Sequence, residues 1–492
     1  MKVLFIYPEY PPTFWSFKYA LPFIDKKAAF PPLGALTVAA MLPKEWEKKL
    51  IDMNIKKLKD EDILWADIIM VSAMIAQTKS AQETILRAKA LGRRVVAGGP
   101  LFTTGYKSFE GVDHFVLDEG EITVPLFLKD LKNNTPKALY RSEIKPDINH
   151  SPIPDWSLIN HNDYGSLAIQ TSRGCPFNCE FCDIIVMNGR VPRLKDPARI
   201  LAEFDAIYET GWKGSVFVVD DNFIGNKNKV KTALRELSVW MKTHNYPFNL
   251  YTEASINLAE DDELMELMKN ANFDSVFVGI ETPDEETLKQ CGKVQNTNMD
   301  MIDSIKKIQK NGMQVQAGFI LGFDSDSTRS FENLVKFIQK SGIVTAMVGL
   351  LTALPETALY KKLKAAGRLI ENSTGINTDF SVNFVPKMDI NILTEGYKKV
   401  LETIFSPKNY YARVITFLQQ YEKSVKIKAF NVKKNMTAFF RSVWKLGITG
   451  RDRRYFWGLL GWTLLRKPHL MVEAVTLSVY GFHFRTVMSR SA

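Results

Sequence analysis

Cysteine is scarce in this chain of 492 residues, which contains only four. Four cysteines are too few for the disulfide framework of a secreted protein, so we expect the reducing environment of the cytoplasm. No uncharged apolar run reaches the length of about 18 residues that a membrane-spanning helix needs. The amino terminus lacks a charged leader region and a small-residue cleavage site, so it predicts a strand rather than a secretion signal.

Acidic residues are scarce in the last fifth of the chain. From Lys408 onward there are sixteen Lys and Arg against three Asp and Glu, which gives +13. The whole chain carries +10, which leaves −3 for the residues before it. A basic surface attracts nucleic acid, membrane phosphates or an acidic partner. No motif for reading bases accompanies it, so nucleic acid is unlikely as a partner.

The apolar pattern divides the chain into three parts and a linker. Residues 1–140 alternate strands with helices, which indicates a parallel doubly wound sheet. Residues 141–166 contain three prolines and little periodicity, so we expect a linker. Residues 167–384 repeat strand and helix, which predicts an incomplete (βα)6 barrel with its chemistry at the carboxyl ends of the strands. Residues 385–492 are mainly helical, basic and aromatic.

The expected strands can be located from their apolar runs. In the first part they are residues 1–8, 66–74, 93–100 and 114–121. In the barrel they are residues 165–174, 214–222, 248–256, 275–282, 315–323 and 346–354.

Three of the cysteines, Cys175, Cys179 and Cys182, lie within eight residues, directly after the first barrel strand. This C-x3-C-x2-C set can bring three thiolates around one iron cluster, and a [4Fe–4S] cluster normally takes four protein ligands. Three ligands leave one iron open for a reactant, as in catalytic metal sites. A zinc site would need a fourth ligand close by, and the nearest histidine, His161, precedes the strand.

Most of the residues at the ends of the other strands that we single out are polar residues or glycines, and parallel sheets bind their ligands there. In the barrel these are Asp220, Asp221, Glu253, Ser255, Glu281, Gly318 and Gly322. In the first part they are Tyr7, Pro8, Ser72, Met74, Gly98, Gly99, Glu119, Gly120 and Glu121. Any single carboxylate among them could equally cap a helix or pair with a lysine, and glycine after a strand is often only a turn.

The pattern C-x3-C-x-aromatic-C, with Phe181 before the last cysteine, resembles the signature of the radical S-adenosylmethionine superfamily. The resemblance implies that the three cysteines hold a [4Fe–4S] cluster and that S-adenosylmethionine chelates its open iron. Phe181 would then pack near the adenine. The resemblance also implies contacts with this cofactor from the barrel strand ends, namely Asp220, Asp221, Glu253, Ser255, Glu281, Gly318 and Gly322.

A doubly wound domain directly before such a barrel resembles the cobalamin-binding class of this superfamily. The stretches FPPLGALTVAAMLP, VSAM, VAGGP and DEGE carry the likeness, which implies cobalamin at the strand ends of the first part. Many cobalamin domains have a loop whose histidine ligates cobalt, but the first loop here reads YPEYPP. We therefore expect cobalt without a histidine ligand from below. A scaffold domain that binds no cobalamin is the alternative.

Four further stretches, VVDDNFIGN, GIETPDEETL, LGFDSDS and LLTALPETALY, resemble the cobalamin-dependent radical methylases that include the hopanoid C-2 methylase. The resemblance implies that a 5′-deoxyadenosyl radical removes hydrogen from an unactivated carbon and methylcobalamin delivers the methyl group. An external electron donor would be needed. The alternatives are a radical rearrangement or cyclisation without methyl transfer, and a cobalamin- or nucleic-acid-binding protein with an inactive barrel.

The fourth cysteine, Cys291, separates these methylases from a methylthiotransferase. A methylthiotransferase needs three more thiolates for its second cluster, and Cys291 is a single spare thiol. Such a residue is most often small and buried, although a catalytic role in hydrogen-atom or proton transfer is the other interpretation.

The sequence is compatible with two classes of substrate, a lipid-like small molecule and a protein or peptide. The Trp, Phe, Leu and Arg of the basic carboxyl-terminal part also resemble an interfacial helix on anionic lipid. A basic docking surface for a peptide substrate fits the same residues equally well. We therefore expect a cytoplasmic protein, with membrane-surface contact and peptide docking left as alternatives.

Overall fold

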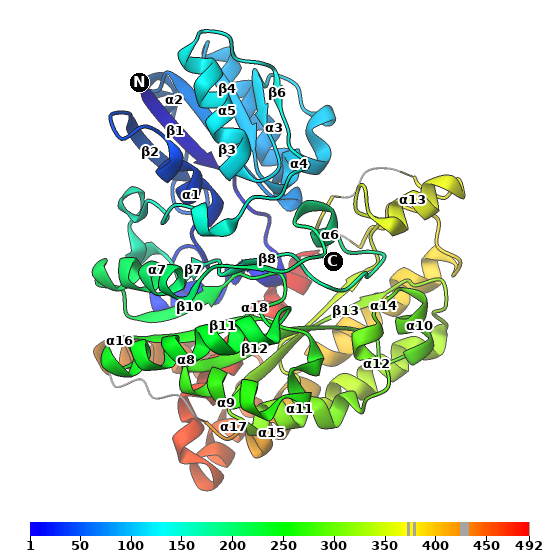
Figure 1. Ribbon diagram of the computed structural model, residues 1–492. Coiled ribbons are helices and arrows are strands. Elements are labelled where there is room, and N and C mark those ends of the chain that lie inside the picture. Colours follow the sequence, from blue (N-terminus) through cyan, green and yellow to red (C-terminus); the bar gives the residue numbers. More distant parts are fainter. Residues whose placement is uncertain (371–373, 377–379, 424–431, 492) are drawn as a thin grey trace.

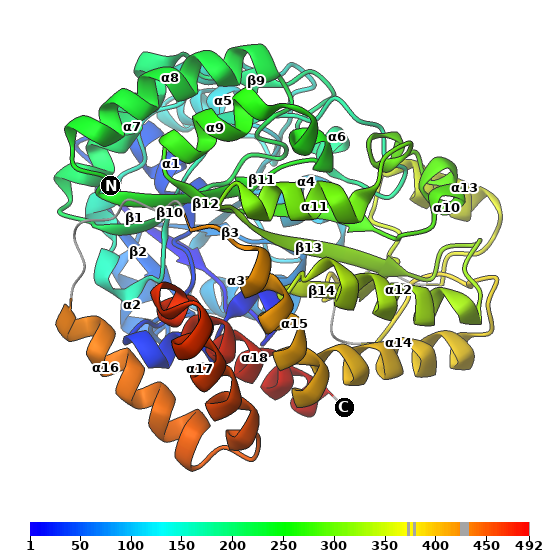
Figure 2. The ribbon, with the colours of Figure 1, turned by 90° about the horizontal axis from the view of Figure 1, so that it is seen from below.

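The computed structural model describes residues 1–370, 374–376, 380–423 and 432–491. An α/β domain at the amino terminus stands above an open barrel, and the carboxyl-terminal helices lie below and beside that barrel (Figures 1 and 2). The predicted class, a doubly wound domain followed by a partial barrel and a mainly helical part, is confirmed.

All six strands of the first sheet run parallel, in the order β2-β1-β3-β4-β5-β6. They are β1 (Lys2–Tyr7), β2 (Glu47–Asp52), β3 (Ile68–Ser72), β4 (Arg94–Gly98), β5 (His114–Val116) and β6 (Leu139–Tyr140). Alternate side chains of β1 enter two separate cores, because successive residues of a strand point to opposite faces. One core contains helices α1 (Leu33–Met41) and α5 (Gly120–Lys132), and the other contains α2 (Asp60–Trp65), α3 (Thr78–Ala90) and α4 (Pro100–Gly105).

The four predicted strands of this domain are present as β1, β3, β4 and β5, but two strands were not predicted. β2 reads EKKLID and buries only its last two residues, so its polar half hides it from an apolar search. It lies at the edge of the sheet, where charged residues are common. β6 has only two residues, which is too short for any period to be seen.

The six barrel strands are also parallel, in the order β14-β13-β12-β11-β10-β7. They are β7 (Leu167–Ile169), β10 (Gly214–Val218), β11 (Phe248–Glu253), β12 (Phe273–Glu281), β13 (Gln314–Leu321) and β14 (Ala346–Leu350), so all six predicted barrel strands are confirmed. The outer helices are α7 (Pro197–Glu209), α8 (Lys227–Thr243), α9 (Asp262–Asn270), α11 (Met301–Lys310) and α12 (Thr328–Ser341). Shorter elements join them: β8 (Ser172–Arg173), α6 (Ile184–Met187), β9 (Arg193–Leu194), α10 (Glu285–Gln290) and α13 (Ala358–Ala365).

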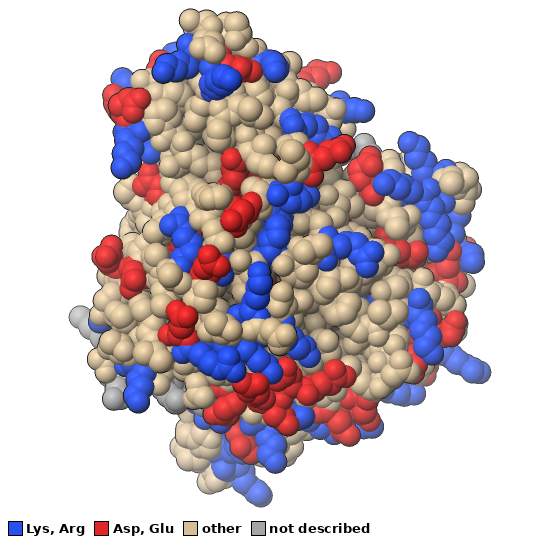
Figure 3. Space-filling model, in the orientation of Figure 1, with Lys and Arg blue, Asp and Glu red and all other residues tan. Residues whose placement is uncertain are grey.

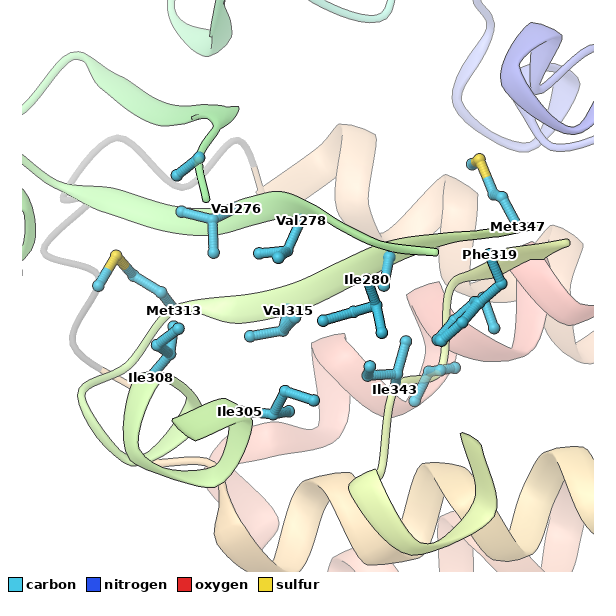
Figure 4. Packing of buried hydrophobic residues seen from close by; sticks show 14 of the residues in the cluster. Val276, Val278, Ile280, Ile305, Ile308, Met313, Val315, Phe319, Ile343 and Met347 are labelled. Carbon is cyan, nitrogen blue, oxygen red and sulfur yellow. The ribbon is translucent and has the colours of Figure 1, made fainter. Parts of the chain in front are cut away.

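The period of two along β12 separates the barrel wall into an outer and an inner face. Val276, Val278 and Ile280 are almost fully buried and pack outward toward Ile305 and Ile308 of α11 (Figure 4). The residues between them face inward and line a cavity: Ser275, Phe277, Gly279 and Glu281. The barrel interior is therefore available to a ligand.

The carboxyl-terminal part is helical, as predicted. Its elements are α14 (Ile390–Phe405), α15 (Pro407–Gln420), α16 (Val432–Ser442), the π-helix η10 (Val443–Ile448), α17 (Arg453–Arg466) and α18 (Met471–Ser491). α14 and α15 pack on α12, and α18 packs on α14 and α15. Among the residues described, none of the helices combines the length and apolar character needed to span a bilayer.

Residues 14–24 leave the first domain and pack against the other two parts. They form two short 3-10 helices, η1 (Phe14–Ser16) and η2 (Leu21–Ile24). The Phe14 ring lies 5.6 Å from Phe405 and 5.7 Å from Phe484, measured between ring centroids. The carbonyl oxygen of Phe14 lies 3.0 Å from Nε2 of the buried His483. This part of the expected first domain thus belongs to the core of the barrel and the carboxyl-terminal helices.

Candidate active site

A cavity of about 1780 Å³ connects the two α/β units. Its upper wall comes from the carboxyl ends of the first sheet, including Ser72, Gly98 and Gly99. Its lower part runs inside the barrel, past Asp221 and Glu253. The carboxyl ends of both sheets therefore face one space, which is where two parallel sheets would bring ligands together.

The three predicted cluster cysteines lie in the loop between β8 and α6. All are free thiols, with Cys179 buried and Cys175 and Cys182 partly exposed. Gly174 has φ +95°, and a Cβ on it would come within 2.9 Å of the Val191 carbonyl oxygen. Glycine is thus required where the backbone passes closest to the returning strand.

Asp220 and Asp221 fix the segment that leads into this loop and the first residue of the loop. The Asp220 carboxylate accepts hydrogen bonds from the backbone N–H and the hydroxyl of both Thr171 and Ser172, at 2.5–2.9 Å. Asp221 accepts from Gly174 N at 2.7 Å and from the Asn188 amide at 2.8 Å. Burial raises the pKa of Asp220 to about 6, although these hydrogen bonds act in the opposite direction. Both carboxylates thus hold the cysteine loop, and their predicted contact with S-adenosylmethionine stays a prediction.

The donor set suits an iron–sulfur cluster. Among the described residues, no three His, Cys, Asp or Glu side chains are grouped tightly enough to hold a single metal ion. Three free cysteine thiols in one short loop are the kind of ligand that iron–sulfur clusters take in proteins. The Asn222 amide nitrogen lies 3.9 Å from Cys175 Sγ, and the Gln295 amide nitrogen lies 3.7 Å from Cys179 Sγ. Such donors to sulfur help to set a cluster's potential.

Two further carboxylates face the cavity beside this loop. Glu253 ends β11, and burial together with the charges of Asp221 and Asp220 raises its pKa to about 7. Glu281 ends β12 with φ +65°, which is rare outside glycine and concentrates at functional sites. Its Oε1 is 2.8 Å from the Lys293 ammonium. Desolvation lowers the pKa of Lys293, but the charges of Glu281 and Cys179 outweigh it and raise that pKa.

The remaining predicted contacts of S-adenosylmethionine divide by position. Phe181 and Gly318 line the cavity, and a Cβ on Gly318 would lie 3.1 Å from the Phe277 ring. Ser255 is bonded to Asn222 at 3.3 Å and so lies next to the Cys175 side chain. Gly322 donates to the Asp326 carboxylate at 2.8 Å and shapes the turn after β13 instead of the cavity wall.

Cys291 lies directly behind the cysteine loop. Its thiol is buried in the barrel core and donates to the Leu288 carbonyl at 3.5 Å, and burial raises its pKa to about 12. Its carbonyl accepts from Glu180 N at 2.9 Å, between two of the cluster cysteines. This position supports the loop, and a catalytic role stays a prediction.

The upper wall presents bare backbone to the cavity. A Cβ on Gly98 would come within 2.5 Å of the Val116 carbonyl, and one on Gly99, at φ +91°, within 2.7 Å of Ser72 Oγ. The neighbouring Val116 and Ser72 thus require glycine at both positions, and the missing side chains let a ligand in the cavity approach the backbone closely. None of the six histidines lines the cavity. The site therefore fits a bulky cofactor whose metal takes no histidine from this wall.

The first loop of this wall is held by its own contacts. The hydroxyls of Tyr7 and Tyr10 share a hydrogen bond of 2.6 Å, and the carbonyl of Pro8 accepts from the Gln77 amide at 2.5 Å. Tyr7 lines the cavity and Pro8 does not. Met74 also lines it, with a side chain that is 49% exposed.

Glu119 and Glu121, predicted at the cobalamin site, pair with arginines of the barrel. Arg173, which stands just before the cysteine motif, lies 2.7 Å from Glu119 and 2.8 Å from Glu121. Arg193 of β9 adds a contact of 2.7 Å to Glu119. Burial would raise the pKa of Glu121, but the hydrogen bonds and charge of Arg173 and the hydroxyl of Ser151 lower it to about 2. The first domain is thereby ionically fixed to the cysteine loop.

The sequence did not predict the roles of Arg173 and Arg193, or of the Asn222 and Gln295 amides beside the cysteine sulfurs. Arg173 was visible in TSRGC as a cation next to the motif, but its acceptors lie 54 and 52 residues away. Asn222 follows the aspartate pair in VVDDNF and was a further polar residue at a strand end. Gln295 and Lys293 follow α10, and no pattern distinguished them.

Comparison with known families agrees with this geometry. The model of the radical SAM superfamily matches residues 169–338, and that of the B12 binding domain matches residues 26–128. A domain of unknown function matches residues 357–492.

Known proteins resemble the chain along its whole length. An uncharacterized methyltransferase of Synechocystis is 42% identical over 490 residues, 98% of this chain and 91% of the relative. The hopanoid C-2 methylase of Rhodopseudomonas palustris is 33% identical over 503 residues, 100% of this chain and 94% of the relative. The solved structure of the cobalamin-dependent S-adenosylmethionine radical enzyme OxsB with aqua-cobalamin has a TM-score of 0.64 at 14% identity. The superposition covers 100% of this chain and 80% of the OxsB chain, so the two proteins share the fold.

Proposed function

Because this chain belongs to the cobalamin-binding radical S-adenosylmethionine family that contains the hopanoid C-2 methylase, we propose that it methylates an unactivated carbon of a lipid-like substrate. Its reaction class is cobalamin-dependent radical C-methylation, with a [4Fe–4S] cluster, S-adenosylmethionine and cobalamin as cofactors. The lipid-like substrate and an external electron donor are the proposed parts.

The residues have separable tasks in this reaction. Cys175, Cys179 and Cys182 would hold the cluster, and the glycine wall at Gly98 and Gly99 would receive cobalamin. When bound, these groups and S-adenosylmethionine supply hydrogen-atom removal and the replacing methyl group. The protein positions the reactants and excludes water, which protects a radical from side reactions.

An aromatic belt inside the barrel supports an apolar substrate. It consists of Trp15, Phe30, Phe217, Tyr251 and Phe277, all of which line the cavity. Phe217 and Tyr251 stack with centroids 4.8 Å apart, Phe30 lies 5.4 Å from Phe217, and Trp15 lies 4.7 Å from Phe277. Rings bury large apolar surfaces but offer few partners for the backbone groups of a peptide. The belt therefore favours a rigid hydrocarbon body over a peptide.

The test is methylation by protein reconstituted without oxygen with iron, sulfide and methylcobalamin. The reaction would contain methyl-labelled S-adenosylmethionine, a chemical reductant and either a hopanoid hydrocarbon or a mixture of cytosolic peptides. We expect labelled methyl on the hopanoid, seen by mass spectrometry, and none with Cys179→Ala. Label on peptides alone would overturn the lipid proposal, and cofactor cleavage without any methylated product would overturn methylation.

We also propose that the carboxyl-terminal helices dock on an anionic membrane. The docking face consists of exposed apolar residues on α16, η10 and α17: Met436, Phe440, Trp444, Ile448, Trp457, Leu464 and Leu465. Trp444 is 63% and Leu465 is 83% exposed, and scattered exposure alone does not gather so many large side chains. The Trp457 indole donates to the Gly447 carbonyl at 3.0 Å. This bond joins the exposed residues of α17 to those of α16 and η10.

Positive charge surrounds the docking face. Lys445, Arg451, Arg453, Arg454 and Arg466 are all exposed. In Figure 3 the lowest projection, which α17 builds in Figure 1, is mostly uncharged with Lys and Arg at its tip. Each basic residue near an anionic leaflet adds about 1 kcal/mol of attraction. Ala438 and Ser442 of α16 line the cavity, so the docking face lies next to the space for substrate.

Vesicle sedimentation with the full chain tests the docking face. We expect binding to phosphatidylcholine vesicles that contain phosphatidylglycerol and about tenfold weaker binding after Phe440→Ser with Trp444→Ser. Val239→Ser is the matched control, because Val239 is 66% exposed on α8. Equal vesicle binding by the double variant would contradict membrane docking through this face. A dimer of the wild type in sedimentation velocity that is lost in the double variant would show that the face binds a second copy of the chain instead.

A further inference from the structure

The cavity continues below the aromatic belt to the amino ends of the barrel strands, where the lining is polar again. Five residues form what we call the lower polar cluster: Asn249, Asp274, Gln314, Lys423 and Glu473. Gln314 is the first residue of β13, and Asn249 and Asp274 are the second residues of β11 and β12. Glu473 is in the first turn of α18. The reaction chemistry at the other end of the barrel uses none of them.

The lower polar cluster has hydrogen-bonding capacity that the described residues leave unused. Gln314 Nε2 and Glu473 Oε2 are buried and have no hydrogen-bond partner among the described residues. The Asp274 carboxylate accepts from the Asn249 amide at 2.6 Å and from the Ser275 hydroxyl at 3.0 Å. A carboxylate has about four acceptor positions, and hydrogen bonds from the described residues occupy two of them. A buried unsatisfied group costs about 1–3 kcal/mol, and two of them on one cavity wall are available to a ligand that enters the cavity.

The charges of the cluster favour a hydrogen-bond donor. Two carboxylates, Asp274 and Glu473, face one ammonium, and Lys423 is already 2.5 Å from Glu473 Oε1. Burial raises the pKa of Asp274 to about 6, although the hydrogen bonds from Asn249 and Ser275 act in the opposite direction. Acceptors in excess, together with one free amide donor, match a hydroxyl group, which both donates and accepts.

The spacing between the two polar ends suits an elongated molecule. Glu281, beside the cysteine loop, and Ser275, bonded to Asp274, are six residues apart on β12. At about 3.3 Å per residue of strand, these positions are about 20 Å apart. The aromatic belt lies between them, so the cavity has a reactive end, an apolar middle and a polar end.

We propose that the lower polar cluster binds a hydroxyl-bearing end of the substrate and so determines which carbon, about 20 Å away, is presented for methylation. The inference rests on the proposed methylation of a lipid-like molecule. It makes Asp274, Gln314 and Glu473 positioning residues, because they act on the far end of the substrate and touch no reacting atom.

The test compares two probes on reconstituted full-length protein: a hopanoid with a terminal hydroxyl and the matching hopanoid hydrocarbon. Binding is followed by calorimetry and the methylated position by mass spectrometry and nuclear magnetic resonance. We expect the hydroxylated probe to bind about tenfold more tightly. Glu473→Gln and Gln314→Met should remove most of that difference and give mixed methylated positions from the hydroxylated probe, while the hydrocarbon is unaffected.

Control variants separate the outcomes. Asp262→Asn removes a carboxylate that is 80% exposed on α9, and it should change neither probe. Equal affinity of the two probes, with a single methylated position in every variant, would overturn the polar-end site but leave lipid methylation intact. If neither hopanoid binds, the proposed substrate itself fails. Asp274→Asn could disturb folding, so the test relies on Glu473→Gln and Gln314→Met, which change residues on α18 and β13.

Discussion

The two ends of the barrel are both polar, yet they use their hydrogen bonds in opposite ways. At the carboxyl ends, Asp220 accepts four bonds from Thr171 and Ser172 and so holds the cysteine loop. At the amino ends, Gln314 Nε2 and Glu473 Oε2 have no partner among the described residues. A saturated carboxylate stabilises the protein, whereas an unsaturated group is available to a ligand. Polar residues at strand ends must therefore be sorted by their partners and not by position alone.

The largest expected effect is at the cysteine loop. Cys179→Ala should reduce iron from about four atoms per reconstituted chain to near zero and abolish cleavage of S-adenosylmethionine, because two thiolates do not retain the cluster. Iron analysis and the visible spectrum measure this. Cys291→Ala is the matched control and should retain its iron; loss of iron from it would make Cys291 a fourth ligand.

Asp220→Ala should be strongly destabilising. It leaves four donors on two residues without their acceptor, at about 1–3 kcal/mol for each buried unsatisfied group. We expect a lower Tm and partial loss of iron, with a smaller effect from Asp220→Asn. A variant with unchanged Tm and iron content would show that the loop does not depend on this carboxylate.

Glu253 should make cofactor binding depend on pH near neutrality. Its raised pKa of about 7 means that the carboxylate is charged above pH 7 and neutral below it. If it binds the cationic S-adenosylmethionine as predicted, affinity should fall severalfold from pH 8 to pH 6, and Glu253→Gln should flatten the curve. Equilibrium binding to the reconstituted protein measures this, and an unchanged curve in the variant would assign the effect to another group.

The same group affects stability with a definite sign. Between its ordinary value of 4.5 and about 7, the folded state binds more protons than the unfolded state. The contribution of Glu253 to the free energy of unfolding therefore decreases as pH rises through this window. Urea titrations of the wild type and Glu253→Gln should diverge there.

The smallest expected effect is on the stability of Gln314→Met. Because Gln314 Nε2 has no partner among the described residues, a similar apolar side chain should leave Tm unchanged or raise it slightly. Thermal unfolding of the free protein measures this. A clear fall in Tm would mean that Gln314 has a structural role, which would remove the contrast between the two ends of the barrel.

Local patterns were sufficient for the parts of the fold that bury continuous apolar runs. All six barrel strands and the cysteine loop could be located in this way, because their signals lie within a few neighbouring residues. The edge strand β2 escaped because half of it is polar. The pairing of Glu119 with Arg173 escaped because it joins two domains, and no short pattern encodes a partner 54 residues away.

The site was predictable as a set of strand ends but not as a set of contacts. The sequence assigned the same role to Asp220 and Asp221, whereas their acceptor atoms serve different residues of one loop. The lower polar cluster was not foreseen, since its residues lie near the ends of strands and helices, where polar side chains are common and usually solvated. Only burial and the count of missing partners distinguish them.

The placement of Phe14 has a consequence for how the protein is made. Its partners include His483 and Phe484 of α18, and His483 is synthesised 469 residues after Phe14. At about 5–20 residues per second, a nascent chain waits roughly 25–90 s with this aromatic segment uncovered. Chains interrupted before α18 would keep it exposed and would be prone to aggregate, so shortened versions of this enzyme should be difficult to recover folded.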